Sequence, residues 1–228
     1  MSLGLARFGH LLVCFSGIDG SGKTTLCREV VTKLRARQVP CRYVYGRFLP
    51  VTIATWFKIA SLQKQRTKQL SRNQYIKQIQ NPLLRSRVVA ILFIIGVLFD
   101  QALRILFKVY IPSILKKEVV ICDRYLFDTV IMDIALNCAF DRNEVWRLLQ
   151  RCLRMFPKVD IAFIVNVPPA IAYQRKAEYP IEMLTYLSDM YLFIGRRFGA
   201  KIMDGTKDLS ELTWYVVSNV VRSNPSAK

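Results

Sequence analysis

Apolar residues are arranged along this chain in two alternating patterns. Short, almost continuous apolar runs lie at 11–16, 118–122 and 160–167, with shorter β-rich segments at 42–45 and 200–203. Between them, apolar residues recur every three or four positions, which predicts helices at 24–38, 83–115, 129–137, 142–155, 169–176, 182–198 and 209–221. Apolar strands that alternate with helices are typical of a parallel sheet covered on both faces, so the pattern predicts an α/β fold.

The length of the chain, 228 residues, suits one domain. No linker rich in Gly, Ser or Pro divides it, so we expect a single domain at 1–222 followed by a frayed tail at 223–228. The segment at 50–80 is basic and rich in Gln, and we expect it to be helical in pieces.

The longest uncharged apolar stretch lies at 88–99 and has 12 residues. A helix that crosses a membrane needs about 20 such residues, and Asp100 and Arg104 interrupt the continuation of this stretch. We therefore favour a buried helix. A helix that rests on a membrane surface is the alternative, because Arg85 and Arg87 precede the stretch.

The chain is strongly basic. It is 52% hydrophobic, which excludes a mainly disordered protein, and its 34 Lys and Arg against 16 Asp and Glu give a formal charge of +18. No acidic residue occurs at 30–99, where 13 Lys and Arg are found. Such an excess points to a polyanionic partner: nucleotide phosphates, nucleic acid or an acidic membrane surface.

Cysteine and histidine usage indicates the compartment. The six cysteines form no CxxC pair and the single histidine is His10, so the sequence does not favour a zinc site. Free thiols are typical of a reducing cytosol, and the apolar run at 11–15 is too short for the core of a signal peptide. We expect a cytoplasmic protein, with peripheral attachment to a membrane left open.

The strongest chemical signal lies at 17–24, where GIDGSGKT fills every fixed position of the GxxxxGK[ST] pattern between an expected strand and an expected helix. Glycines let successive backbone N–H groups point inward and bind phosphate oxygens, and the helix dipole adds positive potential. A lysine here places a cation on the β- and γ-phosphates, and the following hydroxyl binds Mg²⁺. We assign ATP binding to Gly17, Asp19, Gly20, Ser21, Gly22, Lys23, Thr24 and Thr25.

A second chemical signal follows the apolar run at 118–122. Asp123 ends this expected strand, and a carboxylate in that position beside a phosphate loop can hold Mg²⁺, directly or through water, together with Thr24; an aspartate that caps a helix or a turn is the alternative. Arg124 comes next, and a guanidinium beside a metal-binding carboxylate suits a second phosphate group.

Several segments in this order resemble the thymidylate kinase family of P-loop nucleoside monophosphate kinases. The chain has FSGIDGSGKTTL at 15–26, VVICDRY at 119–125, VDIAFIVNVPPAIAYQRK at 159–176 and IMDGT at 202–206. The resemblance extends from 11 to about 221 and implies a P-loop NTPase fold with a central parallel sheet. It also implies an acceptor-side helical region at about 45–115 and a lid region at about 170–190.

The resemblance implies transfer of the γ-phosphoryl group of ATP to a deoxynucleoside monophosphate such as dTMP. Catalysis would fall to Lys23, Asp19, Asp123 and Arg175, where Arg175 is the lid arginine that neutralises charge on the transferred group. Phosphoryl transfer needs mainly alignment and positive charge, which fits this set of residues. The acceptor would be bound by Arg47, Arg104 and Arg124.

The acceptor half departs from the family pattern. The family usually has an acid before the first Gly of the loop, where this chain has Ser16. The family's Arg-Glu-Pro-Gly-like turn corresponds here to YGRFLP at 45–50, in which Arg47 takes the place of the family's arginine. The match of FDQALR at 99–104 to the family's acceptor helix is loose.

Three other functions stay open at this point. One is a P-loop kinase with a different acceptor, lipid-linked or sugar-like. Another is a non-catalytic, basic, ATP-binding module at an anionic membrane surface. Nucleic-acid binding has little support, because the basic segment at 58–87 contains a single aromatic residue, Tyr75, and no recognised reader motif. The expected partners are thus ATP with Mg²⁺ and a phosphate-bearing small molecule; an anionic membrane and a homodimer are left open.

Overall fold

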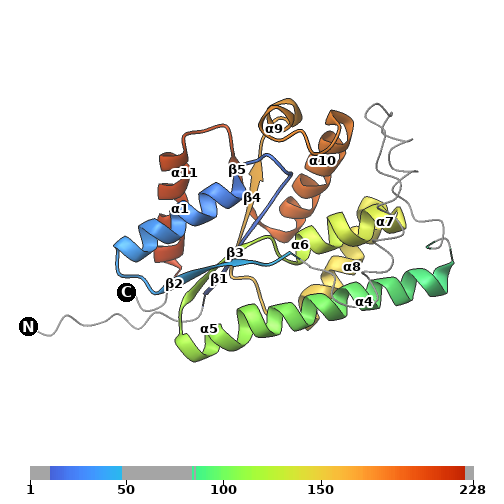
Figure 1. Ribbon diagram of the computed structural model, residues 1–228, viewed down its shortest axis with the longest axis horizontal. Coiled ribbons are helices and arrows are strands. Elements are labelled where there is room, and N and C mark those ends of the chain that lie inside the picture. Colours follow the sequence, from blue (N-terminus) through green and yellow to red (C-terminus); the bar gives the residue numbers. More distant parts are fainter. Residues whose placement is uncertain (1–10, 48–83, 85, 224–228) are drawn as a thin grey trace, which may run out of the picture.

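The computed structural model describes residues 11–47, 84 and 86–223. Its centre is a five-stranded sheet in which every pairing is parallel, in the order β2-β3-β1-β4-β5 (Figure 1). The strands are β1 (Leu11–Ser16), β2 (Cys41–Tyr45), β3 (Val119–Asp123), β4 (Ile161–Asn166) and β5 (Lys201–Asp204). The predicted α/β fold is confirmed.

Helices cover both faces of the sheet. One face packs against α1 (Lys23–Ala36) and α11 (Leu209–Arg222). The other face packs against a continuous run of α6 (Leu126–Asp128), the π-helical η3 (Thr129–Ala135) and α7 (Leu136–Cys138), and against α8 (Arg142–Met155) and α10 (Ile181–Phe198). The short helix α9 (Pro169–Arg175) follows β4.

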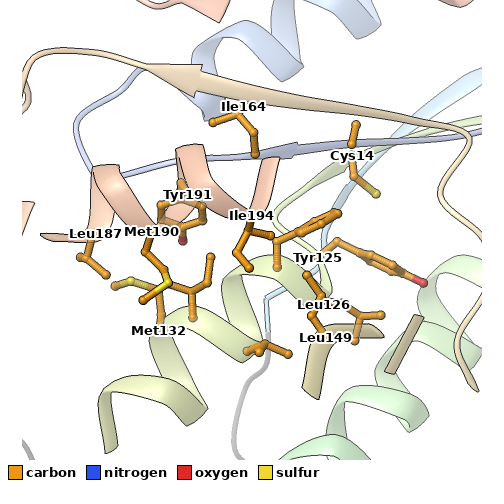
Figure 2. Close-up of a cluster of buried hydrophobic side chains, with 14 of the residues drawn as sticks. Cys14, Tyr125, Leu126, Met132, Leu149, Ile164, Leu187, Met190, Tyr191 and Ile194 are labelled. Carbon is orange, nitrogen blue, oxygen red and sulfur yellow. The ribbon is translucent and has the colours of Figure 1, made fainter. Parts of the chain in front are cut away.

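Alternation along the strands divides the core into two clusters. In β1, Leu12 and Cys14 point to the side of α8 and α10, whereas Val13 and Phe15 point to the side of α1 and α11. Figure 2 shows the first cluster, where side chains of α10 and of the segment after β3 meet Cys14 and Ile164 of the sheet. The three central strands β1, β3 and β4 are buried on both faces, so their sequences are almost continuous apolar runs, whereas the edge strands β2 and β5 are partly exposed.

The order of the strands places the site. The chain adds β2 and β3 on one side of β1 and then β4 and β5 on the other, so the direction of winding reverses at β1. In open parallel sheets, ligands bind beyond the carboxyl ends of the strands at such a reversal. The register pairs Phe15 with Asp123, so the end of β3 lies beside the start of the phosphate loop.

A long helical rod runs along one edge of the molecule, and it corrects one prediction. It consists of α4 (Arg87–Ile105), the π-helical η2 (Leu106–Tyr110) and α5 (Ile111–Lys116) (Figure 1). The prediction of a buried helix at 88–99 is wrong for one side of α4, because Phe93 and Val97 are buried whereas Ile91 and Ile95 are more than half exposed. The hydrophobicity of the stretch reflects two apolar faces, of which only one meets the core.

Length and composition alone would let Arg87–Tyr110 cross a membrane, and it is the one helix in the described ranges that passes this test. The predictions for 50–80 and for the tail beyond 223 fall outside the described residues. The division of the chain into acceptor and lid regions stays a prediction.

Candidate active site

The phosphate loop has the backbone that an anion-binding nest requires. Gly20 and Gly22 have φ values of 83° and 86°, and Gly22 is the N-cap of α1. The first turn of α1 contains no acidic residue, so the positive end of the helix dipole is not neutralised there. A Cβ atom at Gly20 would overlap the backbone carbonyl of Ala172 in α9. The loop therefore packs directly against the helix that carries Arg175.

Lys23 lies folded over this loop. Its side chain is buried, and Nζ donates to the Ile18 carbonyl at 2.6 Å and to Ser21 Oγ at 3.1 Å. Burial is the main cause that lowers the pKa of Lys23 to about 8; the charge of Arg124 lowers it further and nearby carboxylates oppose the shift. The ammonium group is thus held among the loop atoms where the nearby carboxylates do not offset burial and the charge of Arg124, which favours an anionic ligand. Thr24 and Thr25 follow as exposed residues in the first turn of α1.

Asp123 joins the phosphate loop to β3. Thr24 Oγ1 donates to Asp123 Oδ2 at 2.6 Å, and Tyr43 Oη donates to the same oxygen at 2.9 Å. The other oxygen, Oδ1, is buried and has no hydrogen-bond partner among the described residues. Burial and the Asp123 carboxylate raise the pKa of Tyr43, so the phenol stays a donor. An orphaned carboxylate oxygen is costly unless something binds it.

The residues around Asp123 fit a Mg²⁺ ion that is completed by its ligand. Within the described ranges, no group of three His, Cys, Asp or Glu side chains is placed to hold a metal. Mg²⁺ usually keeps several waters and binds one or two protein oxygens plus substrate phosphates. Thr24 Oγ1 and Asp123 Oδ1 could supply that small set of protein oxygens.

A buried network of charges surrounds Arg124. Its guanidinium donates through Nη2 to Asp19 in the phosphate loop and through Nη1 to Asp128 Oδ1 in α6, the latter at 2.9 Å. Tyr191 Oη of α10 donates to the same Asp128 oxygen at 2.8 Å, and Ser16 Oγ donates to the second one at 2.6 Å. The network thus joins the end of β1, the phosphate loop, the end of β3, α6 and α10.

Arg124 is distinguished both by the charges around it and by its backbone conformation. Burial opposes its charge, but the charges of Asp128 and Asp19 outweigh burial and raise the pKa of Arg124. Burial by itself would raise the pKa of Asp19, but the charges of Arg124 and Lys23 outweigh burial and lower this pKa. Arg124 also has φ 70°, which costs a residue with a side chain about 1–2 kcal/mol. Strain of this kind is typical of functional sites.

Sequence reasoning missed Asp128 and Tyr191. Asp128 lies four residues after Arg124, and this spacing of opposite charges was the available signal, although Arg124 itself precedes α6. The resemblance predicts an acid at position 16, where this chain has Ser16. Ser16 donates to the buried carboxylate of Asp128, so the nearest acid is the hydrogen-bond partner of residue 16 and not residue 16 itself. Nothing in the sequence indicates that Tyr191 belongs to the site, because an aromatic residue among the regularly spaced apolar residues of a helix is expected to pack in the core.

The three arginines predicted on the acceptor side differ in their surroundings. Arg47 forms an ion pair with the buried Asp133 of η3 at 3.2 Å, and Arg124 belongs to the network described above. Arg104 of α4 is half-buried and instead donates to the Tyr45 carbonyl at 2.9 Å. Its neighbour Gln101 donates to the Gly46 carbonyl at 2.8 Å. Both residues of α4 thus hold the turn that follows β2.

Arg175 lies over the phosphate loop. Its Nη1 donates to the Gly205 carbonyl at 3.2 Å and would lie 4.0 Å from a Cβ atom at Gly22. Lys176 forms an exposed ion pair with Glu178 at 2.7 Å. The structure therefore brings Arg175, Lys23 and the loop amides to one place, and it brings Thr24 to Asp123 and Asp19 to Arg124.

The parallel sheet with a GxxxxGK[ST] loop after β1 and an aspartate at the end of β3 defines a P-loop NTPase fold. No protein-family model matches the chain. It is 27% identical over 210 residues to a probable thymidylate kinase of Metallosphaera sedula, covering 89% of this chain and 88% of the relative.

Two further relatives carry the same name. A probable thymidylate kinase of Sulfurisphaera tokodaii is 25% identical over 210 residues, with 88% and 90% of the two chains covered. A thymidylate kinase of Leptospira borgpetersenii is 24% identical over 175 residues, with 74% and 69% covered. The similarity spans most of the chain at low identity, and it supports a kinase of the nucleoside monophosphate type.

Removing the charge of Asp128 should destabilise the fold. We expect Asp128→Asn to lower the free energy of unfolding in urea by about 2–4 kcal/mol, because Arg124 loses one of its two buried carboxylates. The matched control is Asp189→Asn, whose carboxylate is 56% exposed and 4.0 Å from Arg142. That variant should change the unfolding free energy by less than about 0.5 kcal/mol. Equal effects of the two substitutions would contradict the network.

The contact between the phosphate loop and α9 can be tested at two glycines. Gly20→Ala and Gly199→Ala both place a side chain at a positive φ, 83° and 80°, but only the first meets other atoms within 4 Å. We expect Gly199→Ala to cost about 1 kcal/mol of unfolding free energy and Gly20→Ala at least about 1 kcal/mol more. If the two values agree, α9 does not pack on the loop as described.

Proposed function

We propose that the protein is an ATP-dependent phosphotransferase that moves the γ-phosphoryl group of ATP to a deoxynucleoside monophosphate such as dTMP. The observation that carries this proposal is the convergence of a phosphate loop, a buried lysine and an orphaned aspartate oxygen at the carboxyl ends of β1 and β3. The relatives named thymidylate kinase support the same class of reaction.

The donor side follows from the loop. Backbone amides of 17–24 bind the phosphate oxygens of ATP, and Lys23 exchanges its bonds to Ile18 and Ser21 for the β- and γ-phosphates. A Mg²⁺ ion would supply further positive charge to the phosphate oxygens. Thr24 and Asp123 would hold it. Arg175 approaches from α9 and adds positive charge beside the transferred group.

The acceptor side is organised by the Asp19–Arg124 pair. Two carboxylates hold the guanidinium of Arg124 in one orientation. Its remaining surface can therefore bind the acceptor phosphate without a further loss of conformational entropy. Arg47, held by Asp133, adds a second cation. Asp19 belongs to the loop and contacts Arg124, and we expect it to lie between donor and acceptor. Each residue aligns or neutralises, which is what phosphoryl transfer requires.

A second acceptor class is favoured by one observation. The helix that holds the turn after β2 through Gln101 and Arg104 exposes an apolar face on its outer side. A lipid-linked monophosphate would present its phosphate to the same arginines and its apolar part to that helix. This class therefore belongs in any acceptor screen.

Turnover with a panel of acceptors tests the proposal. With ATP and Mg²⁺, we expect dTMP to raise ADP formation at least about 100-fold over hydrolysis by water, and Lys23→Ala to remove at least about 10³-fold of that rate. Lys33→Ala, on the exposed side of the same helix, is the control and should keep full activity. The panel should include other nucleoside monophosphates, sugar phosphates and a lipid-linked monophosphate. ATP binding without turnover on any acceptor would favour the non-catalytic module.

The lowered pKa of Lys23 predicts how ATP affinity depends on pH. Phosphate oxygens stabilise the ammonium, so the pKa of Lys23 in the complex lies above its value of about 8 in the free protein. The affinity should therefore be constant below pH 8 and should fall as pH rises above 8, because binding must then take up a proton. Calorimetry of ATP binding from pH 6.5 to about 9.5 measures this. Lys23→Met should bind ATP weakly, and its affinity should not fall above pH 8. If the affinity of this variant falls as that of the wild type does, Lys23 is not the cause of the pH dependence.

A further inference from the structure

The outer face of the rod formed by α4, η2 and α5 is rich in exposed apolar side chains. Eleven of the described side chains from Val88 to Leu115 are large, apolar and exposed, and we call them the α4–α5 stripe. Ile91, Ile95 and Phe99 each expose more than half of their surface, and Leu115 exposes 77%. Isolated apolar residues on a surface are ordinary, but a continuous patch of this extent marks an interaction surface.

The inner face of the rod belongs to the fold. Phe93 and Val97 are buried in a cluster with Ile134 of η3, and Ile105 and Val109 are buried in the main core. The rod therefore cannot leave the domain to cross a bilayer without exposing this core. What it offers to a partner is one long side, which Figure 1 shows along the edge of the molecule away from α11.

The charges that accompany the stripe are of one sign. Between positions 87 and 117 the exposed charged residues are basic, namely Arg87, Lys108, Lys116 and Lys117. The single acidic residue in that range, Asp100, is buried. A second copy in a two-fold symmetric dimer would place the same patch against itself, so these cations would meet one another with no acid from the rod to pair with. An anionic lipid surface offers apolar chains and negative head groups together.

We propose that the α4–α5 stripe docks the protein onto the surface of an anionic phospholipid bilayer, with the rod lying in the plane of the membrane. The apolar side chains enter the boundary between head groups and acyl chains, while the lysines extend along their aliphatic stems to the phosphates. Gln101 and Arg104 reach from the same helix to the turn after β2. Docking therefore brings the acceptor side of the site close to the lipid surface.

Vesicle binding without nucleotide tests the proposal independently of kinase activity. We expect co-sedimentation with vesicles of phosphatidylcholine and phosphatidylglycerol, at least about tenfold stronger than with phosphatidylcholine alone and weakened by salt. The variant Ile91→Gln/Ile95→Gln/Phe99→Gln should lose at least about tenfold of this affinity. The control, Met155→Gln/Trp214→Gln, changes side chains that are 80% and 63% exposed elsewhere and should bind as the wild type does.

The lysines form a separate arm of the test. Lys108→Gln/Lys116→Gln should weaken binding to the anionic vesicles by about fivefold for each charge removed and should not change binding to phosphatidylcholine. Lys33→Gln/Lys201→Gln is the matched control, because both lysines are exposed on other elements. If both pairs weaken binding equally, attraction depends on net charge alone and the stripe has no special role.

Two results would overturn the proposal. One is wild-type protein that binds neither kind of vesicle. The other is a wild-type dimer in solution that becomes monomeric in the triple variant without any vesicle binding, since a second copy would then cover the stripe. If the triple variant does not fold, an environment-sensitive dye at Ile95→Cys, in a Cys138→Ser background, replaces it. Its emission should shift to the blue with anionic vesicles, and the same dye at Trp214→Cys should not respond.

Discussion

The charge network around Arg124 is the interaction on which the rest of the site depends. Taking a guanidinium and two carboxylates out of water costs several kcal/mol per ion, and only a complete set of partners offsets this. The set is complete only when the ends of β1 and β3, the phosphate loop, α6 and α10 are all in place. Formation of the network therefore requires the folded arrangement of both halves of the site, and the loop cannot take its shape independently of β3.

The same coupling extends to the helix that carries the donor-side arginine. Gly20 of the loop lies against the backbone of Ala172, and Arg175 donates to the turn after β5. Ser21 also lies close to the turn after β5, because its carbonyl oxygen would be 3.0 Å from a Cβ atom at Gly205. The phosphate loop is thus enclosed by backbone on two sides.

Sequence alone predicted the parts of the molecule that obey local rules. The central strands β1, β3 and β4 are almost continuous apolar runs because both of their faces are covered, and the loop at 17–24 has a fixed spacing of glycines and lysine. The position of Asp123 beside Thr24 followed from parallel strands ending at one edge. The partners of Arg124 could not be predicted in this way, since Tyr191 lies on a helix that is 67 positions further along the chain and only the tertiary fold brings it close.

The failure at 88–99 has a different physical origin. Periodicity predicts which side of a helix meets a core only when the other side is polar. In α4 both sides are apolar, so the sequence identified a helix but not its solvent-facing side. The structure resolves this through the polar residues that interrupt the pattern: Gln101 and Arg104 bond to the turn after β2 and fix the rotation of the helix. Two polar contacts thus decide which apolar face is left for a partner. The same contacts connect α4 to the turn that carries Arg47, which is one of the residues predicted to bind the acceptor.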